Sequence, residues 1–213
     1  MTMILDLLNQ NPAYFVAWVA AILIALTIHE YAHALVATAQ GDDTAESQGR
    51  LTLNPMAHMD MVGFLALIFI GFGWGKPVPF NGEKLKNQRL GPVLVALAGP
   101  GANLIMAVLV GILLKVVILF THLPASNLGM IFLALLLNIN IILLIFNLIP
   151  IPPLDGSKLL FAVLPARLRS VRYWLERYGS FILLILIILD SALPFSILGW
   201  LFNYSLDFVY RWF

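Results

Sequence analysis

Long apolar runs separated by short polar patches dominate the hydrophobic pattern of this chain. Three runs, at about 13–40, 91–120 and 128–149, are long enough to supply the roughly 20 residues with which a helix crosses a bilayer. The pattern therefore predicts an integral membrane protein whose main elements are membrane-spanning helices.

Two shorter apolar runs, about 180–193 and 195–210, follow near the end of the chain, and Pro194 lies between them. Because proline interrupts a helix, this pair predicts a C-terminal helical hairpin over 179–213. The preceding segment, 165–178, mixes arginines with aromatic residues, as helices in the membrane interface do. Together the apolar runs predict an all-α polytopic membrane protein with about five spanning helices.

The apolar run 61–75 is rich in glycine and, at 15 residues, is short for a spanning helix. If it spanned, the basic segment 76–89 would lie on the outer side, against the positive-inside rule. We therefore expect a re-entrant segment, with spanning as the alternative. The alternation at 50–53 indicates a strand, which predicts a small membrane-associated β element together with the turn-rich segment 76–89.

Composition supports a single membrane-embedded domain over 1–213, with a core at 13–156. Of the 213 residues, 61% are hydrophobic and only 11% are charged, whereas a soluble domain has about a quarter charged residues. The net charge of +1 argues against a nucleic-acid partner. The absence of cysteine excludes disulfides, thiolate metal ligands and a cysteine nucleophile.

The basic residues predict how the helices are oriented. Lysines and arginines gather in 76–89 and 165–178, while the N-terminal stub and the turn at 121–127 contain none. The positive-inside rule then places both basic segments in the cytoplasm. The N-terminus lacks the basic start of a signal peptide, so we treat it as part of the mature chain. The expected location is the cell (plasma or inner) membrane, crossed several times.

Residues 29–33, HEYAH, place two histidines and a glutamate inside an apolar run. On a helix, residues four apart share a face, so His29 and His33 can bind one metal ion. Glu30 lies beside them, placed to take a proton from a metal-bound water whose pKa falls from about 15.7 towards 7. Ionisable groups are costly in lipid, which favours metal binding over simple packing in the helix.

A hydrolytic zinc site needs a third protein ligand and one position for water. Asp155 follows the prolines that end the preceding helix, and irregular backbone at membrane depth is tolerated only where protein or a wet cavity covers it. The predicted orientation places Asp155 at the same cytoplasmic depth as the histidines. An Asp-Gly pair is also typical of an ordinary turn, so from spacing alone both interpretations remain.

Several motifs resemble the site-2 proteases, which are intramembrane zinc metalloproteases. The most specific are HEYAH on an apolar helix and FNLIPIPPLDG at 146–156. Weaker similarities lie at 49–60, 73–81 and 97–103, in the same order along the chain. The resemblance is to the small bacterial and archaeal-type members without a PDZ domain.

This resemblance implies which residues form the site. His29, His33 and Asp155 would bind one zinc ion, and Glu30 would be the general base and acid. Asn147 would stabilise the tetrahedral intermediate, as an amide N–H aimed at an oxyanion can. A helix-packing role is the alternative for Asn147.

The resemblance also implies a substrate and a way of binding it. The reaction would be hydrolysis of a peptide bond in or near a transmembrane segment of a membrane protein, on the cytosolic side of the bilayer. The polar segments 49–60 and 73–90 would form a small sheet whose edge binds an unwound substrate. His58 matches a family position to which the sequence assigns no role, and the oligomeric state is left open.

Two other functions compete with a peptidase: a catalytically silent metal-binding scaffold and a metal transporter. A transporter is expected to spread polar ligands along a path through several helices, whereas here they converge at one depth. A silent relative is expected to lack Glu30 or a ligand, and all are present. The sequence therefore favours the zinc endopeptidase.

Overall fold

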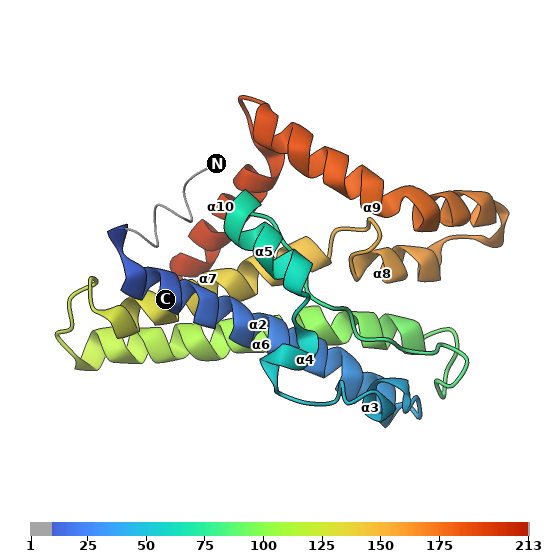
Figure 1. Cartoon of the computed structure of the whole chain (residues 1–213), viewed down its shortest axis with the longest axis horizontal. Coiled ribbons are helices and arrows are strands. Elements are labelled where there is room, and N and C mark those ends of the chain that lie inside the picture. The colour runs from blue at the N-terminus through green and yellow to red at the C-terminus, as the bar shows by residue number, and fades with distance from the viewer. Residues whose placement is uncertain (1–9, 213) are drawn as a thin grey trace.

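Three long apolar helices form the centre of the molecule. The computed structural model describes residues 10–212, so residues 1–9 of the N-terminal stub and the last residue of the predicted hairpin over 179–213 lie outside the described residues. Helices α2 (Pro12–Ala39), α6 (Gly91–Phe120) and α7 (Leu128–Asn147) are each long and apolar enough to span a membrane. They pack against one another along their lengths (Figure 1), and they confirm the three long predicted runs.

The other helical elements surround this three-helix core. Figure 1 shows α8 and the first part of α9 near the end of the core where α2 ends and α6 begins. In chain order these elements are α3 (Thr44–Ser47), α4 (Pro55–His58), α5 (Met61–Ile70), α8 (Gly156–Val163), the 3₁₀ helix η1 (Ala166–Leu168), α9 (Arg169–Ala192) and α10 (Ile197–Tyr210).

Small residues at every fourth position let α2 approach its neighbours closely. Residues four apart share one helix face, and small side chains on that face allow backbones to come together in membranes. The two histidines of HEYAH continue the same buried face, which therefore packs against α6. This face consists of Ala17, Ala21, Ala25, His29, His33 and Ala37.

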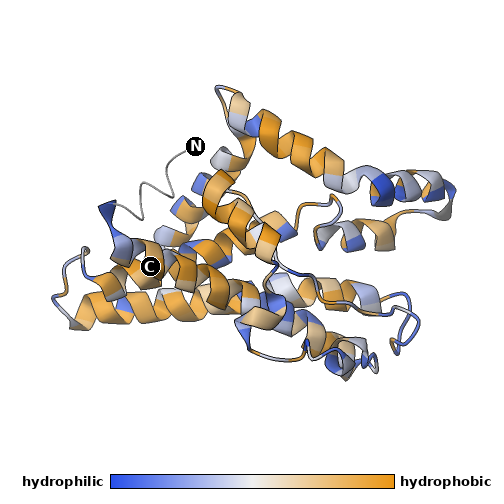
Figure 2. Cartoon of the chain, viewed as in Figure 1, coloured by the Kyte–Doolittle hydropathy of each residue, from blue (hydrophilic) through white to orange (hydrophobic). Residues whose placement is uncertain are grey.

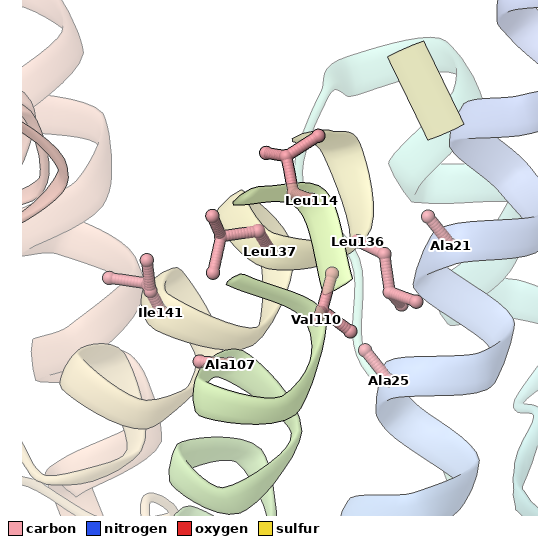
Figure 3. Close-up of a cluster of buried hydrophobic side chains, with 8 residues drawn as sticks. All are labelled: Ala21, Ala25, Ala107, Val110, Leu114, Leu136, Leu137 and Ile141. Carbon is pink, nitrogen blue, oxygen red and sulfur yellow. The ribbon is translucent and has the colours of Figure 1, made fainter. Parts of the chain in front are cut away.

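A cluster of apolar side chains fills the space between the three core helices (Figure 3). α2 contributes two alanines to it, while the larger side chains come from α6 and α7, so small and large residues interlock. Figure 2 shows that the outward faces of the long helices are also largely apolar, as expected of helices in lipid. The cluster consists of Ala21, Ala25, Ala107, Val110, Leu114, Leu136, Leu137 and Ile141.

The run 61–75 begins as α5, and its last residue returns to the side of Met59, just before the start of this helix. α5 ends at Ile70, and the φ of 84° at the following Gly71 lies in the left-handed region that suits a glycine C-cap. The chain then reverses, and Gly75 forms an antiparallel bridge with Met59. The Lys76 N–H also donates to the His58 carbonyl at 2.8 Å. Both ends of the run therefore lie side by side, and that the run re-enters a membrane stays a prediction.

Two glycines bring the two arms of the run 61–75 into contact. A Cβ on Gly63 would lie 2.1 Å from the Trp74 carbonyl oxygen, and one on Gly73 would lie 2.2 Å from the Gly63 carbonyl oxygen. Both contacts are with backbone atoms, which cannot rotate away as a flexible side chain can. A side chain at either position would force α5 and the returning segment apart.

We predict that Gly63→Ala destabilises the protein, even though alanine is the better helix former by about 1 kcal/mol. Forcing a methyl group into a filled contact costs about 1–3 kcal/mol, which thermal unfolding in detergent would show as a lower Tm. Gly82→Ala is the matched control, because the nearest atom to its Cβ would be 3.9 Å away. Equal Tm values for the two variants would contradict this packing.

The predicted β element is not confirmed. Within residues 10–212 the structure has no strand, and the pairing of Met59 with Gly75 is an isolated bridge. Leu51 and Thr52, in the middle of the alternating residues 50–53, form a bend instead. The chain turns into α4 directly after them, because the Asn54 side chain accepts the Met56 N–H and Pro55 opens the helix. Too few extended residues remain to form a ladder.

The predicted count of about five spanning helices is not confirmed either. Among the described residues three helices are long and apolar enough to span a membrane. The number of candidate spans rises to four if α9 and α10 together form one bent span. In place of the antiparallel hairpin expected over 179–213, α9 and α10 meet at 82°. The Asp190 carboxylate holds this corner by accepting the N–H groups of Ile197 at 2.6 Å and Leu198 at 3.1 Å.

Candidate metal centre

Three potential metal ligands meet where α2 faces the loop that follows α7. His29, His33 and Asp155 each offer one ligand atom, and these atoms lie within 4.8 Å of one another. The two Nε2 atoms of the histidines are 3.0 Å apart, and each is 3.2 Å from Oδ2 of Asp155. The structure thus brings together the three residues that the sequence singled out as ligands.

The donor set and its dimensions fit a zinc ion. Four tetrahedral ligands at about 2.0–2.1 Å from zinc lie roughly 3.3–3.4 Å from one another, close to the separations seen here. Oδ2 of Asp155 is buried and has no partner with hydrogen-bond geometry, which suits an atom directed at a metal. Two imidazole nitrogens and one carboxylate, with a fourth position for water, are typical ligands of catalytic zinc.

Both histidines direct Nε2 towards this point because Nδ1 is engaged elsewhere. Nδ1 of His33 lies 2.7 Å from the Val95 carbonyl oxygen, and Nδ1 of His29 lies 2.6 Å from Oδ1 of Asn103. A backbone carbonyl only accepts, so Nδ1 of His33 carries the proton. Its Nε2 therefore presents a lone pair, which is the form that binds a metal.

Asp155 reaches the histidines from a tightly folded loop, 148–155. It occupies the N-cap position of α8, yet its side chain makes no capping hydrogen bond and is directed at the histidines. A Cβ on Gly156 would lie 2.3 Å from the Leu148 carbonyl oxygen, so this glycine permits the loop to close on itself. The Asp-Gly pair thus forms a turn and also presents a candidate ligand.

The charge state of Asp155 suits metal binding. Burial raises the pKa of its carboxyl group, but the imidazoles of His29 and His33 outweigh burial and lower this pKa to about 2. The carboxyl group is therefore ionised at neutral pH, as a metal ligand must be.

Glu30 is buried beside the ligands and is tied to the segment that returns from α5. Its Oε2 accepts the Val78 N–H at 3.0 Å. Pro77 and Pro79 have no N–H, so Val78 supplies the one backbone donor of 77–79. The KPVPF sequence thus presents a single N–H to the carboxylate and fixes its orientation.

Arg50 and His58 hold this returning segment in place. The guanidinium of Arg50, which is only 5% exposed, donates to the Lys76 carbonyl. His58 is fully buried, with Nε2 2.8 Å from the Thr52 carbonyl oxygen, and its own carbonyl accepts the Lys76 N–H. Among the described residues His58 is not part of the ligand group. Sequence reasoning did not identify Arg50, although a charged residue within an otherwise sparsely charged motif was a usable signal.

Asn147 is the last residue of α7 and is half-buried at the start of the loop that carries Asp155. Its Nδ2 donates to the Leu143 carbonyl of its own helix at 3.0 Å. The structure thus places Asn147 at the junction of α7 and the loop that carries Asp155, with one amide N–H engaged within the helix.

The LAGPGAN motif at 97–103 lies directly against the ligands, a role that sequence reasoning did not assign. A Cβ on Gly99 would lie 2.4 Å from Nε2 of His33 and 2.6 Å from Nε2 of His29. Gly99 therefore leaves the space that the imidazoles, and an ion between them, require. Asn103, four residues further on the same face, contacts His29.

We predict that Gly99→Ala abolishes zinc binding, because its methyl group would displace the imidazoles. Gly101→Ala is the control, since it lies in the same helix and its Cβ would have no atom within 4 Å. Both changes raise helix propensity, so the clash is the relevant difference between them. Metal analysis of the purified variants should find zinc in Gly101→Ala and none in Gly99→Ala. Equal zinc contents would contradict the geometry.

Comparison with known proteins identifies relatives that are named as zinc metalloproteases. The family model for peptidase family M50 matches residues 117–189. The putative zinc metalloprotease YwhC of Bacillus subtilis is 40% identical over 173 residues, which cover 80% of this chain and 79% of YwhC. The putative zinc metalloprotease Rip2 is 32% identical in Mycolicibacterium smegmatis and 33% identical in Mycobacterium tuberculosis. Each match covers 90% of this chain and 74% of the relative. No solved structure shows significant similarity.

The match to YwhC extends over most of both chains, and the apolar helices are those of a membrane protein. The chain belongs to peptidase family M50, the site-2 proteases, and is a zinc metalloprotease.

Proposed function

We propose that this protein is an intramembrane protease that hydrolyses peptide bonds in or near the transmembrane segments of membrane proteins. The observation that supports this most directly is the position of the ligand triangle. His29 and His33 lie on the face of α2 that packs against α6, and both helices have spanning length. A hydrolytic site on helices of spanning length supports a substrate that is itself embedded in the membrane.

The proposed mechanism uses one zinc ion, held by His29, His33 and Asp155. Zinc bound there would supply a Lewis acid that activates water and polarises the substrate carbonyl. Glu30 accepts the proton of the attacking water and returns it to the departing amine. Because the Val78 N–H holds its carboxylate, Glu30 reorganises little during the transfer.

Asn147 is proposed to donate a hydrogen bond to the oxyanion that develops on the substrate carbonyl. An asparagine amide carries two N–H groups, and the Leu143 carbonyl takes one of them. The position of Asn147 at the start of the Asp155 loop supports this role.

The proposed partner is a substrate whose transmembrane helix has opened, because peptide bonds inside a helix are shielded from attack. The returning segment 76–80 has no helix or turn, and its Val78 N–H binds Glu30. An unwound substrate strand pairing with this segment would be brought to the general base. The bilayer supplies the substrate, which diffuses to the site within it.

We also propose a multi-pass protein of the cell membrane whose site opens towards the cytoplasm. Basic residues in 76–89 and 165–178 support this orientation through the positive-inside rule. Figure 2 shows that polar residues gather at the end of the molecule where α3 and the start of α9 lie.

Single-cysteine labelling tests this orientation without background, because the chain contains no cysteine. Gln88→Cys should react with a membrane-impermeant thiol reagent only after the cells are permeabilised. Ser126→Cys, in the turn between α6 and α7, should react in intact cells. Both side chains are exposed, so access depends on the side of the membrane. The opposite pattern of labelling would refute the proposed orientation.

The proposed mechanism predicts that Glu30→Gln loses activity while still binding zinc. Loss of a general acid–base typically lowers the rate about 10²–10⁴-fold. The measurement is cleavage of a transmembrane peptide by purified protein, with and without a chelator, alongside the zinc content. His33→Ala should lose both zinc and cleavage. The mechanism is wrong if zinc-loaded Glu30→Gln cleaves as fast as the parent.

A further inference from the structure

Two buried asparagines connect the candidate metal centre to α7. Asn103 on α6 and Asn140 on α7 are both fully buried. Oδ1 of Asn103 lies 2.6 Å from Nδ1 of His29, and its Nδ2 donates to Oδ1 of Asn140 at 2.8 Å. Nδ2 of Asn140 then donates to the Leu136 carbonyl at 2.8 Å. The hydrogen-bonded chain thus runs from α2 through α6 to α7.

The Leu136 backbone carbonyl determines the direction of every hydrogen bond that connects His29, Asn103 and Asn140. The Leu136 carbonyl only accepts, so Asn140 presents its nitrogen there and its oxygen to Asn103. Asn103 must then present its nitrogen to Asn140, and that nitrogen also donates to the Ala25 carbonyl at 3.3 Å. Its oxygen is left facing His29.

The Asn103 oxygen, at the end of this series of hydrogen bonds, determines which nitrogen of His29 carries the proton. Facing the Asn103 oxygen, Nδ1 of His29 must be protonated, and Nε2 keeps the lone pair that a metal requires. Turning either amide over would place two donors or two acceptors together between fully buried side chains, which is strongly unfavourable.

We propose that Asn103 and Asn140 act together as positioning residues that maintain the metal-binding tautomer of His29. This inference rests on the zinc site proposed above. The two histidines are held differently: His33 is held by the Val95 backbone carbonyl, whereas Nδ1 of His29 depends on side chains. Asn140 therefore controls zinc affinity although two hydrogen bonds separate it from the ligand.

Asparagines in membrane helices also hold helices together, so a purely packing role must be distinguished. Asn138 provides the comparison, because it lies on α7 only two residues away. Its Oδ1 accepts the Tyr210 hydroxyl at 2.8 Å and so connects α7 to α10. If packing between helices were all that mattered, losing either asparagine would have the same kind of effect.

The first experiment compares zinc affinity, measured by competition with a chromophoric chelator, and the Tm of each zinc-free protein. Asn140→Leu and the smaller Asn140→Ala should weaken zinc binding about 10–100-fold, the usual effect of losing a partner behind a ligand. Asn138→Leu should bind zinc as the parent does. Asn140→Asp should restore affinity, because a buried, protonated carboxyl group can still accept from Asn103 and donate to Leu136.

The second experiment reads the tautomer directly. The chain has four histidines, so ¹⁵N NMR of histidine-labelled, zinc-free protein can be assigned by single substitutions. His29 should be protonated at Nδ1 in the parent and in Asn140→Asp, and should become a mixture of tautomers in Asn140→Ala. A change in packing alone would lower the Tm without changing this signal.

The outcomes separate this inference from the proposed function. Parent-like zinc affinity and tautomer in Asn140→Ala would overturn the inference. So would equal losses of affinity in the Asn140→Ala and Asn138→Leu proteins. A parent that binds zinc no better than His33→Ala would instead refute the zinc site itself.

Discussion

The close approach of α2 to α6 is the contact on which the metal centre depends. Three groups of α6 reach the histidines there: the Val95 carbonyl, the bare backbone of Gly99 and the Asn103 amide. Alanines on the facing stripe of α2 permit this separation, and larger residues would remove it. An unpaired polar group in hydrocarbon costs roughly several kcal/mol. The packing of α2 on α6 avoids this cost, because it gives the Nδ1 atoms of both histidines hydrogen-bond partners.

The remaining parts of the site come from two irregular segments. The loop 148–155 delivers Asp155 to the histidines, and the segment returning from α5 binds Glu30 through Val78. Neither segment could face lipid alone, because its backbone groups would be unsatisfied there. Each approaches a helix closely at one point: the Asp155 loop meets α9 where Gly179 faces Pro152, and the returning segment meets α2 where Gly75 faces Leu26.

Sequence patterns predicted well wherever the physical cause is local. The four-residue spacing of HEYAH on a helix was enough to pair His29 with His33, and run lengths were enough to locate α2, α6 and α7. They predicted poorly where a single contact decides the structure. The early start of α4 at Pro55 prevents a strand at 50–53, and Asp190 turns α10 away from a hairpin.

The amino-acid sequence by itself determined the three long apolar helices and the pairing of His29 with His33, because hydrophobic periodicity and the spacing of two ligands on one helix are properties of neighbouring residues. Only the tertiary structure decided how the asparagines of α7 differ: Asn140 connects to His29 through Asn103, Asn138 bonds Tyr210, and Asn147 bonds its own helix. The reason is geometric. Which side chains meet depends on how each helix is rotated about its axis and on where helices cross, and long-range packing sets both.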